Sequence, residues 1–150
     1  MDKETLIDKV RALESRKDLF NLLNEIKADL LGDKSYPFTR KQFLILCNPK
    51  NDKKRYYPFE IPKKSGGMRQ ICAPCGNLKW FQLCLNEIFK ALYTPSPYAM
   101  GFTEGRSIVD NARMHTNQNY VFNIDLKDFF PSIDQARVWK RLQLAPFNFN

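Results

Sequence analysis

Hydrophobic residues in the first part of the chain recur at spacings of three and four, which is typical of an amphipathic helix. Between Ser15 and Leu31 the recurring apolar positions are Leu19, Leu22, Leu23, Ile26 and Leu30. Ser15 with Asp18 predicts a capped start for this helix, and Gly32 predicts its end. A shorter amphipathic helix is expected before it, whereas the apolar run at residues 43–46 is too short to assign.

The middle of the chain has the pattern of a β-hairpin. Residues 56–61 and 68–73 have the composition of strands, and Lys63-Lys64-Ser65-Gly66-Gly67 lies between them as a turn. Adjacent glycines allow positive φ and a close approach of a phosphate to the backbone amides, and the neighbouring cations add favourable charge. From its residues alone, the tip is either a solvated hairpin end, which is the commoner case, or a phosphate site.

A loop that contains two glycines follows the next predicted helix, at residues 78–92. Its motifs are Gly101-Phe102 and Gly105-Arg106-Ser107, and Ser107 suits the N-cap of a short helix over residues 107–115. Glycines let a backbone pass close to a nucleic-acid strand, and Arg106 and Ser107 can donate hydrogen bonds to its phosphates. Taken alone, the same residues are also explained by a loop that caps a helix.

The segment 120–126 alternates between large apolar and other residues, which predicts a strand. Its large apolar residues share one face: Phe122, Ile124 and Leu126. Asp125 lies on the opposite face, near the end of the strand, so its carboxylate should point away from the packed side. Ser132 with Gln135 predicts the capped start of a following helix.

Charge and length narrow the class of protein. The chain has 150 residues, which suits one domain with a helical extension. Its 24 Lys and Arg residues against 16 Asp and Glu residues give a net charge of +8, which suits nucleic acid, although many basic domains bind none. No apolar run approaches the roughly 20 residues that span a bilayer. Because the N-terminus also lacks the form of a secretory signal, we expect a cytoplasmic protein without a membrane partner.

Three motifs, taken in order, resemble the reverse transcriptases, and within them the bacterial branch of retron and group II intron enzymes. They lie at residues 61–71, 101–115 and 123–133, and the last two are more similar to retron enzymes. The resemblance covers roughly residues 56–142. The fold that it implies is α+β, with an N-terminal helical region (1–35), reverse-transcriptase fingers (36–115, with hairpin 56–73 and helices 78–92 and 107–115) and the start of a palm (116–150).

The activity that this resemblance implies is RNA-directed DNA synthesis by two-metal nucleotidyl transfer. In this interpretation Asp125 is the catalytic metal ligand, and the backbone carbonyl of Leu126 helps to hold the second of two Mg²⁺ ions, with Mn²⁺ as the alternative ion. The implied partners are an RNA template, a DNA or RNA primer and deoxynucleoside triphosphates.

The resemblance also assigns roles to cations in the first two motifs. Lys63 and Arg69 would clamp the triphosphate of the incoming nucleotide, with Lys64 as a weaker candidate, and Arg suits this role because its planar group can grip phosphate oxygens in a bidentate way. Arg106 and Ser107 would contact the template strand.

The third motif would complete the nucleotide site. Asp128 and Phe129 would lend their backbone amides to the phosphates, and Phe130 would exclude a 2′-hydroxyl and so select deoxynucleotides. One of the two aromatic rings is also expected to fill the core. Asp134 is expected only to stabilise the first turn of the following helix.

The sequence departs from the family in one respect. Reverse transcriptases supply further carboxylates from a Tyr-x-Asp-Asp hairpin, and no such sequence occurs in these residues. We therefore expect a part of a longer enzyme that is truncated before this hairpin and is inactive by itself. Two alternatives stay open: a non-catalytic nucleic-acid-binding module, and a template-independent or protein-primed polymerase of bacterial defence. Self-association is also expected, because the apolar face of segment 120–126 would lack part of its cover.

Overall fold

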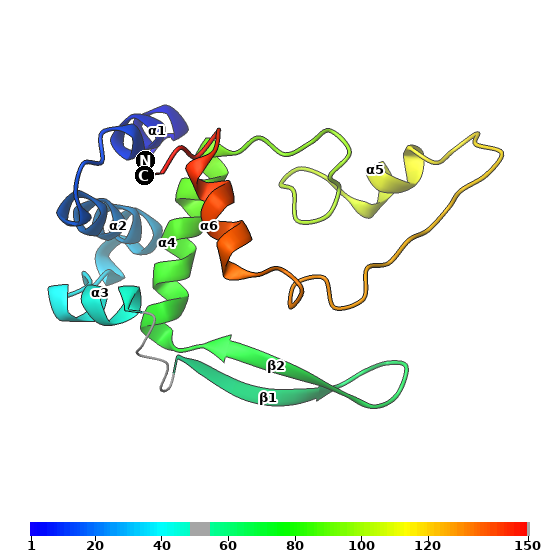
Figure 1. The fold of residues 1–150 in the computed structure, drawn as a ribbon, viewed down its shortest axis with the longest axis horizontal. Coiled ribbons are helices and arrows are strands. Elements are labelled where there is room, and N and C mark those ends of the chain that lie inside the picture. The colour runs from blue at the N-terminus through cyan, green and yellow to red at the C-terminus, as the bar shows by residue number, and fades with distance from the viewer. Residues whose placement is uncertain (49–54, 150) are drawn as a thin grey trace. The chain divides into compact units, whose positions relative to one another are not determined.

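The computed structural model describes residues 1–48 and 55–149. The polar, basic composition of residues 48–55 predicts a loop, and most of this stretch lies outside the described residues. The chain forms two compact units, Met1–Ala91 and Leu92–Asn150 (Figure 1). Helices and one antiparallel hairpin make up the described secondary structure, which is compatible with the predicted α+β class. None of the helices in the described residues is both long and apolar enough to cross a membrane.

The first unit opens with three helices joined by short turns. The helices are α1 (Lys3–Arg11), α2 (Arg16–Leu31) and α3 (Arg40–Cys47), and the 3-10 turn η1 (Gly32–Lys34) lies between α2 and α3. The predicted limits of α2 are confirmed: the Ser15 side chain accepts a hydrogen bond from the Asp18 amide, and Gly32 ends the helix with a φ of 55°. The unassigned apolar run belongs to α3, which begins with a capping box between Thr39 and Gln42.

Helix α4 (Gly76–Leu92) supplies the longest apolar face of the first unit. It buries Leu78, Phe81, Cys84, Ile88 and Ala91 at helical spacing. The Phe81 ring lies 6.0 Å from that of Phe38 and 6.1 Å from that of Phe43, both measured between centroids. The predicted helix at 78–92 is therefore confirmed, and it packs on α3 and on the segment between η1 and α3.

That segment is held against α2 by two polar side chains. The Asn24 side chain accepts a hydrogen bond from the Phe38 amide (2.6 Å) and donates one to the Phe38 carbonyl (3.3 Å). Lys27, which is buried, donates to the Tyr36 carbonyl at 2.7 Å, and its ammonium lies 4.0 Å from the centroid of the Phe38 ring. Burial lowers the pKa of Lys27. These contacts fix Phe38, which is 2 % exposed, in the core.

The predicted hairpin is confirmed and consists of β1 (Tyr56–Pro62) and β2 (Met68–Pro74). Ile61 pairs with Arg69 next to the turn, and the Lys63 amide donates to the Gly67 carbonyl at 2.9 Å. Positive φ values at Gly66 (89°) and Gly67 (81°) explain the glycines. At the other end, the Gln82 side chain donates to the Tyr56 hydroxyl at 2.8 Å, which links the hairpin to α4. In Figure 1 the turn is the part of the hairpin farthest from the helices of its unit.

The described part of the second unit contains two helices, α5 (Ile108–Arg113) and α6 (Gln135–Gln143). Helix α5 is capped by Ser107, as predicted, but ends at Arg113 rather than at residue 115. Helix α6 is capped by Asp134, whose carboxylate accepts from the Arg137 amide at 2.8 Å. The prediction of Ser132 as the cap is wrong, because its hydroxyl donates to a carbonyl of the preceding turn instead.

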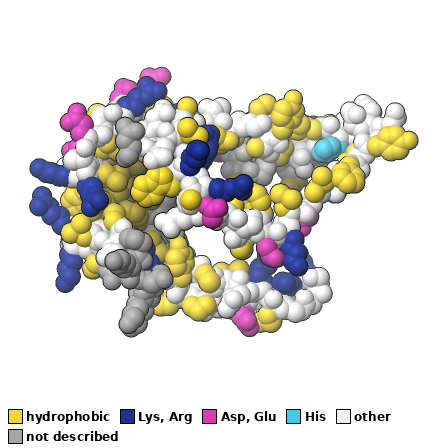
Figure 2. Space-filling view, in the orientation of Figure 1, with side chains coloured by type: hydrophobic (Ala, Val, Ile, Leu, Met, Phe, Trp, Pro, Cys, Tyr) yellow, Lys and Arg dark blue, Asp and Glu magenta, His cyan; other side chains and the backbone are white. Residues whose placement is uncertain are grey.

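The predicted strand over residues 120–126 is also wrong. The segment has no regular secondary structure, and among the described residues the structure has one sheet, formed by β1 and β2. Alternation fixes which side chains share a face, but a strand also needs a neighbour for its backbone hydrogen bonds. Without one, Phe122, Ile124 and Leu126 are 86 %, 75 % and 63 % exposed. Hydrophobic side chains are likewise visible on the surface around α5 (Figure 2). The self-association expected from such exposure stays a prediction.

Candidate functional site

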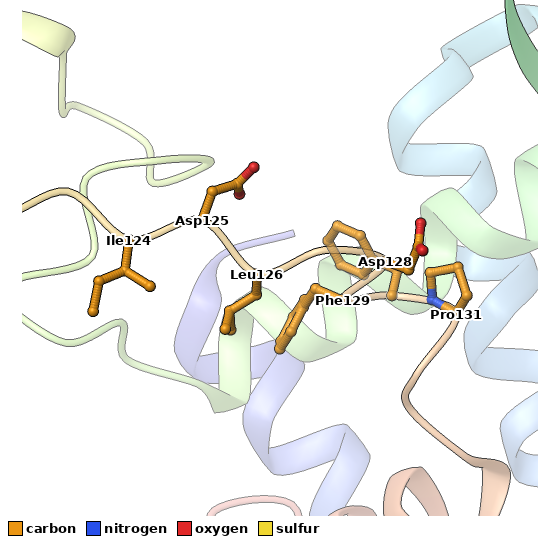
Figure 3. A pocket seen from close by; sticks show the side chains of 7 residues that line it. Ile124, Asp125, Leu126, Asp128, Phe129 and Pro131 are labelled. Atoms are coloured by element: carbon orange, nitrogen blue, oxygen red, sulfur yellow. The ribbon is translucent and has the colours of Figure 1, made fainter.

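Asp125 lies in an open hollow of about 560 Å³ within the second unit. The hollow is lined by Ile124, Asp125, Leu126, Asp128, Phe129, Phe130 and Pro131. Figure 3 shows the Asp125 carboxylate on the opposite side of the chain from the Ile124 and Leu126 side chains. The predicted alternation is thus present in extended backbone, although the packed side that was expected under the apolar residues is absent from the described part of this unit.

A tight turn follows Asp125 and brings a second carboxylate to the same hollow. Asp128 has a φ of 51°, in the left-handed region that Asp tolerates better than most residues. The Ser132 amide donates to the Asp128 carbonyl (3.0 Å) and to the Phe129 carbonyl (3.2 Å), and the Ser132 hydroxyl donates to the Phe129 carbonyl (2.6 Å). In the described residues, neither the Asp128 amide nor the Phe129 amide donates to another backbone group. The turn therefore uses its carbonyls internally and leaves these two amides without a backbone acceptor among the described residues.

The two aromatic rings of this turn pack on each other. Their centroids lie 5.3 Å apart with an interplanar angle of 70°, an edge-to-face arrangement. Phe129 is 46 % exposed and Phe130 is 77 % exposed. The expectation that one of them fills the core is wrong, because the described part of the second unit has no buried residue at this position or elsewhere.

The donor set near Asp125 suits a hard cation but is small. A carboxylate and a carbonyl oxygen, here from Asp125 and Leu126, are ligands that Mg²⁺ prefers. The described residues contain no group of three or more His, Cys, Asp or Glu side chains that could hold a metal ion. The hollow therefore fits part of a Mg²⁺ site, and a pair of ions would need further ligands.

The three cations of the hairpin tip lie in the first unit. Lys63, Lys64 and Arg69 are exposed, and none of the ion pairs found in residues 1–48 and 55–149 uses them. Arg69 pairs across the sheet with Ile61, two residues before Lys63, so both charges flank the turn. This arrangement can receive a phosphate without first breaking a salt bridge.

Arg106 and Ser107 lie in the second unit, and both are engaged within the protein. The Arg106 Nη1 group donates to the carbonyls of Ser96, Pro97 and Ala99. The Ser107 hydroxyl donates to the Asp110 carboxylate at 2.6 Å and lowers the pKa of that carboxyl. The predicted template contacts are therefore also structural residues, and no motif in the sequence indicates the three carbonyls that Arg106 contacts.

Three groups of site residues thus stand apart in the chain. The tip cations belong to the first unit, whereas the Asp125 hollow and the Arg106 loop belong to the second. Their assignment to one active site stays a prediction.

Comparison with known proteins places the chain beside the retron reverse transcriptases. It is 41% identical over 90 residues to Retron Mx65 reverse transcriptase of Myxococcus xanthus, a match that covers 60% of this chain and 21% of that protein. It is 39% identical over 88 residues to Retron Ec86 reverse transcriptase of Escherichia coli, with 57% and 27% covered, respectively. Retron Mx162 reverse transcriptase of Myxococcus xanthus is 40% identical over 84 residues, with 55% and 17% covered.

These matches confirm the predicted similarity to reverse transcriptases of the retron kind. The chain spans between about a sixth and about a quarter of the length of these three relatives. No protein-family model matches the chain, and no solved structure matches it.

Proposed function

We propose that this chain is part of an RNA-directed DNA polymerase of the retron type, to which it contributes the fingers and the beginning of the palm. The observation that carries this proposal is the identity of 39–41% with three retron reverse transcriptases. The exposed basic hairpin and the carboxylate hollow are consistent with it, because a polymerase needs cations for a triphosphate and acids for its metal ions.

Asp125 is the residue that we assign to the metal ions. Its carboxylate and the Leu126 carbonyl would hold Mg²⁺, or Mn²⁺ in its place, with the remaining ligands supplied from outside the described residues. When bound, the ions supply activation of the primer 3′-hydroxyl and stabilisation of the leaving pyrophosphate. The Asp128 side chain has no metal role in this assignment.

We assign two parts of the chain to the incoming nucleotide, the hairpin tip in the first unit and the turn after Asp125 in the second. Lys63 and Arg69, supported by Lys64, would bind the triphosphate of a deoxynucleotide. The amides of Asp128 and Phe129, which have no backbone acceptor among the described residues, would donate to phosphate oxygens of the nucleotide. Phe130 would lie against the sugar and exclude a 2′-hydroxyl.

The remaining partners follow from the reaction. An RNA template would pass along the loop that carries Arg106 and Ser107, and a DNA or RNA primer would end near Asp125. We place this reaction in the cytoplasm. The sequence has no Tyr-x-Asp-Asp hairpin, so this chain by itself should not extend a primer.

Binding of a deoxynucleoside triphosphate tests the assignment of the hairpin tip. The double variant Lys63→Ala/Arg69→Ala should bind it at least about a hundredfold more weakly, since two charge-assisted contacts of roughly 1.5–3 kcal/mol each are lost. Lys79→Ala, an exposed lysine on α4, is the matched control and should bind normally.

Two results would count against the proposal. Equal affinity of the wild-type chain and the double variant would remove the tip from the nucleotide site. Primer extension by this chain on an RNA template, lost in Asp125→Ala, would show that the 150 residues suffice for catalysis. That result would overturn the proposal that further metal ligands come from outside the described residues.

A further inference from the structure

The loop between α4 and α5 is organised around one arginine. The Arg106 Nη1 group donates hydrogen bonds to the carbonyls of Ser96 (2.6 Å), Pro97 (3.0 Å) and Ala99 (2.8 Å). A positively charged donor shared among three carbonyl oxygens is a strong local anchor, because each bond is charge-assisted. The carbonyls of a whole turn therefore face inward toward this guanidinium.

Further hydrogen bonds close the same loop at both ends. The Ala99 amide donates to the Ser96 carbonyl at 3.0 Å, which closes the first turn. The Thr103 hydroxyl donates to the Ala99 carbonyl at 2.9 Å, and the Arg106 amide donates to the Thr103 carbonyl at 3.3 Å. Residues 96–106 thus form a loop whose two ends are tied together and whose carbonyls at Ser96, Pro97, Ala99 and Thr103 are bonded within it.

The outer surface of the loop is aromatic. Tyr98 is 76 % exposed and Phe102 is fully exposed. Phe102 also has a φ of 57°, a left-handed conformation that is unfavourable for a large side chain. The bonds to the Ala99 and Thr103 carbonyls flank this residue and hold it in that conformation.

We propose that Arg106 is a positioning residue, which shapes the 96–106 loop so that Tyr98 and Phe102 face a single-stranded nucleic acid and stack on its bases. This inference rests on the proposed function, because the nucleic acid is the template of that reaction. Aromatic rings on a rigid backbone are a common platform for single strands. Because Nη1 is committed to three carbonyls, an end-on grip on a phosphate through both terminal nitrogens would require these bonds to break.

Two substitutions at Arg106 and one matched control distinguish a role in shaping the loop from direct contact with a phosphate. Arg106→Ala removes the anchor, whereas Arg106→Lys keeps a charged donor that can meet carbonyls but cannot form a bidentate phosphate contact. Arg113→Ala removes the same charge from α5, where the guanidinium lies 3.7 Å from the Asp110 carboxylate and takes no part in the loop.

The first measurement is amide hydrogen exchange over residues 96–106 in the chain without nucleic acid. Arg106→Ala should accelerate exchange of the Ala99 and Arg106 amides at least about tenfold, and Arg106→Lys should restore most of the protection, with Arg113→Ala unchanged. Wild-type exchange in Arg106→Ala would overturn the inference, whatever the chain binds.

The second measurement is the affinity for a single-stranded RNA as a function of salt concentration. For a positioning role, Arg106→Ala should bind about tenfold more weakly, with the slope of log affinity against log salt unchanged, and Arg106→Lys should recover the affinity. If Arg106 instead contacts a phosphate, the slope for Arg106→Ala would fall in magnitude by roughly 0.7, and Arg106→Lys would keep the wild-type slope. That result would overturn the inference. No binding by the wild-type chain would count against the proposed function, while the exchange result would still decide whether Arg106 holds the loop.

Discussion

The pair of hydrogen bonds between Asn24 and the Phe38 backbone gives a stability prediction that can be worked from the structure. Asn24→Ala leaves the Phe38 amide and carbonyl without the partners that they have at 2.6 Å and 3.3 Å. A partly buried polar group that loses its partner costs about 1–3 kcal/mol, and the longer bond contributes at the low end. Alanine returns about 0.5 kcal/mol of helix propensity. The expected net loss in the free energy of unfolding is therefore about 2 kcal/mol.

Asn21→Ala is the matched control for this substitution. Asn21 lies on the exposed side of the same helix, so its replacement makes the same chemical change without loss of the contact to Phe38. It should be neutral or stabilising by about 0.5 kcal/mol. The difference between the two variants isolates the contact from helix propensity.

Urea unfolding followed by circular dichroism at 222 nm measures both variants. Helices α1 to α4 supply most of this signal, and the slope of the free energy against urea should stay constant if only stability changes. An Asn24→Ala protein as stable as the Asn21→Ala protein would show that the bonds to Phe38 contribute nothing. In that case the packing of the Phe38 ring and the Lys27 bond to the Tyr36 carbonyl would have to fix the segment after η1.

Three further predictions concern the buried Cys84, the proposed selection of deoxynucleotides by Phe130 and the exposed segment 120–126. Burial raises the pKa of Cys84 to about 11, above the ordinary 9.0, so the contribution of the buried thiol to stability is full below pH 9 and is lost as pH rises toward 11. In urea titrations, the difference in the free energy of unfolding between wild type and Cys84→Ala should shrink by about 2 kcal/mol across that pH range. A constant difference would contradict the burial of this thiol. In an active polymerase that contains this chain, Phe130→Ala should raise ribonucleotide incorporation at least about tenfold relative to Phe129→Ala. Equal effects of the two substitutions would show that Phe130 is not the residue that excludes a 2′-hydroxyl. Sedimentation velocity should show self-association of the chain, and Ile124→Lys should reduce it. Leu44→Lys, at another exposed apolar position, should leave it unchanged. Identical behaviour of the two variants would exclude segment 120–126 as the contact between copies.

The elements that sequence reasoning predicted correctly are those with local signals. Helix α2 carries its cap at Ser15 and its stop at Gly32, and the hairpin carries its turn at Gly66 and Gly67. In both, the residues that specify the element lie within it or beside it.

Predictions failed where the deciding partner lies far along the chain or where two signals compete. Segment 120–126 alternates like a strand but has no neighbour among the described residues with which to pair. Ser132 and Asp134 are both suitable caps two positions apart, and the carboxylate of Asp134 caps α6 because Ser132 is used by the preceding turn. The role of Arg106 depends on carbonyls seven to ten residues away, which no motif indicates.

The central claim is that Asp125, and not Asp128, holds the metal ions of a polymerase. The most direct test is a retron reverse transcriptase in which the matching segment of this chain, about 90 residues, replaces the relative's own. This hybrid should copy an RNA template into DNA in the presence of Mg²⁺. Asp125→Asn should abolish synthesis, and Asp128→Asn, which makes the same change three residues later, should retain it. An inactive hybrid, or equal losses in the two variants, would contradict the account.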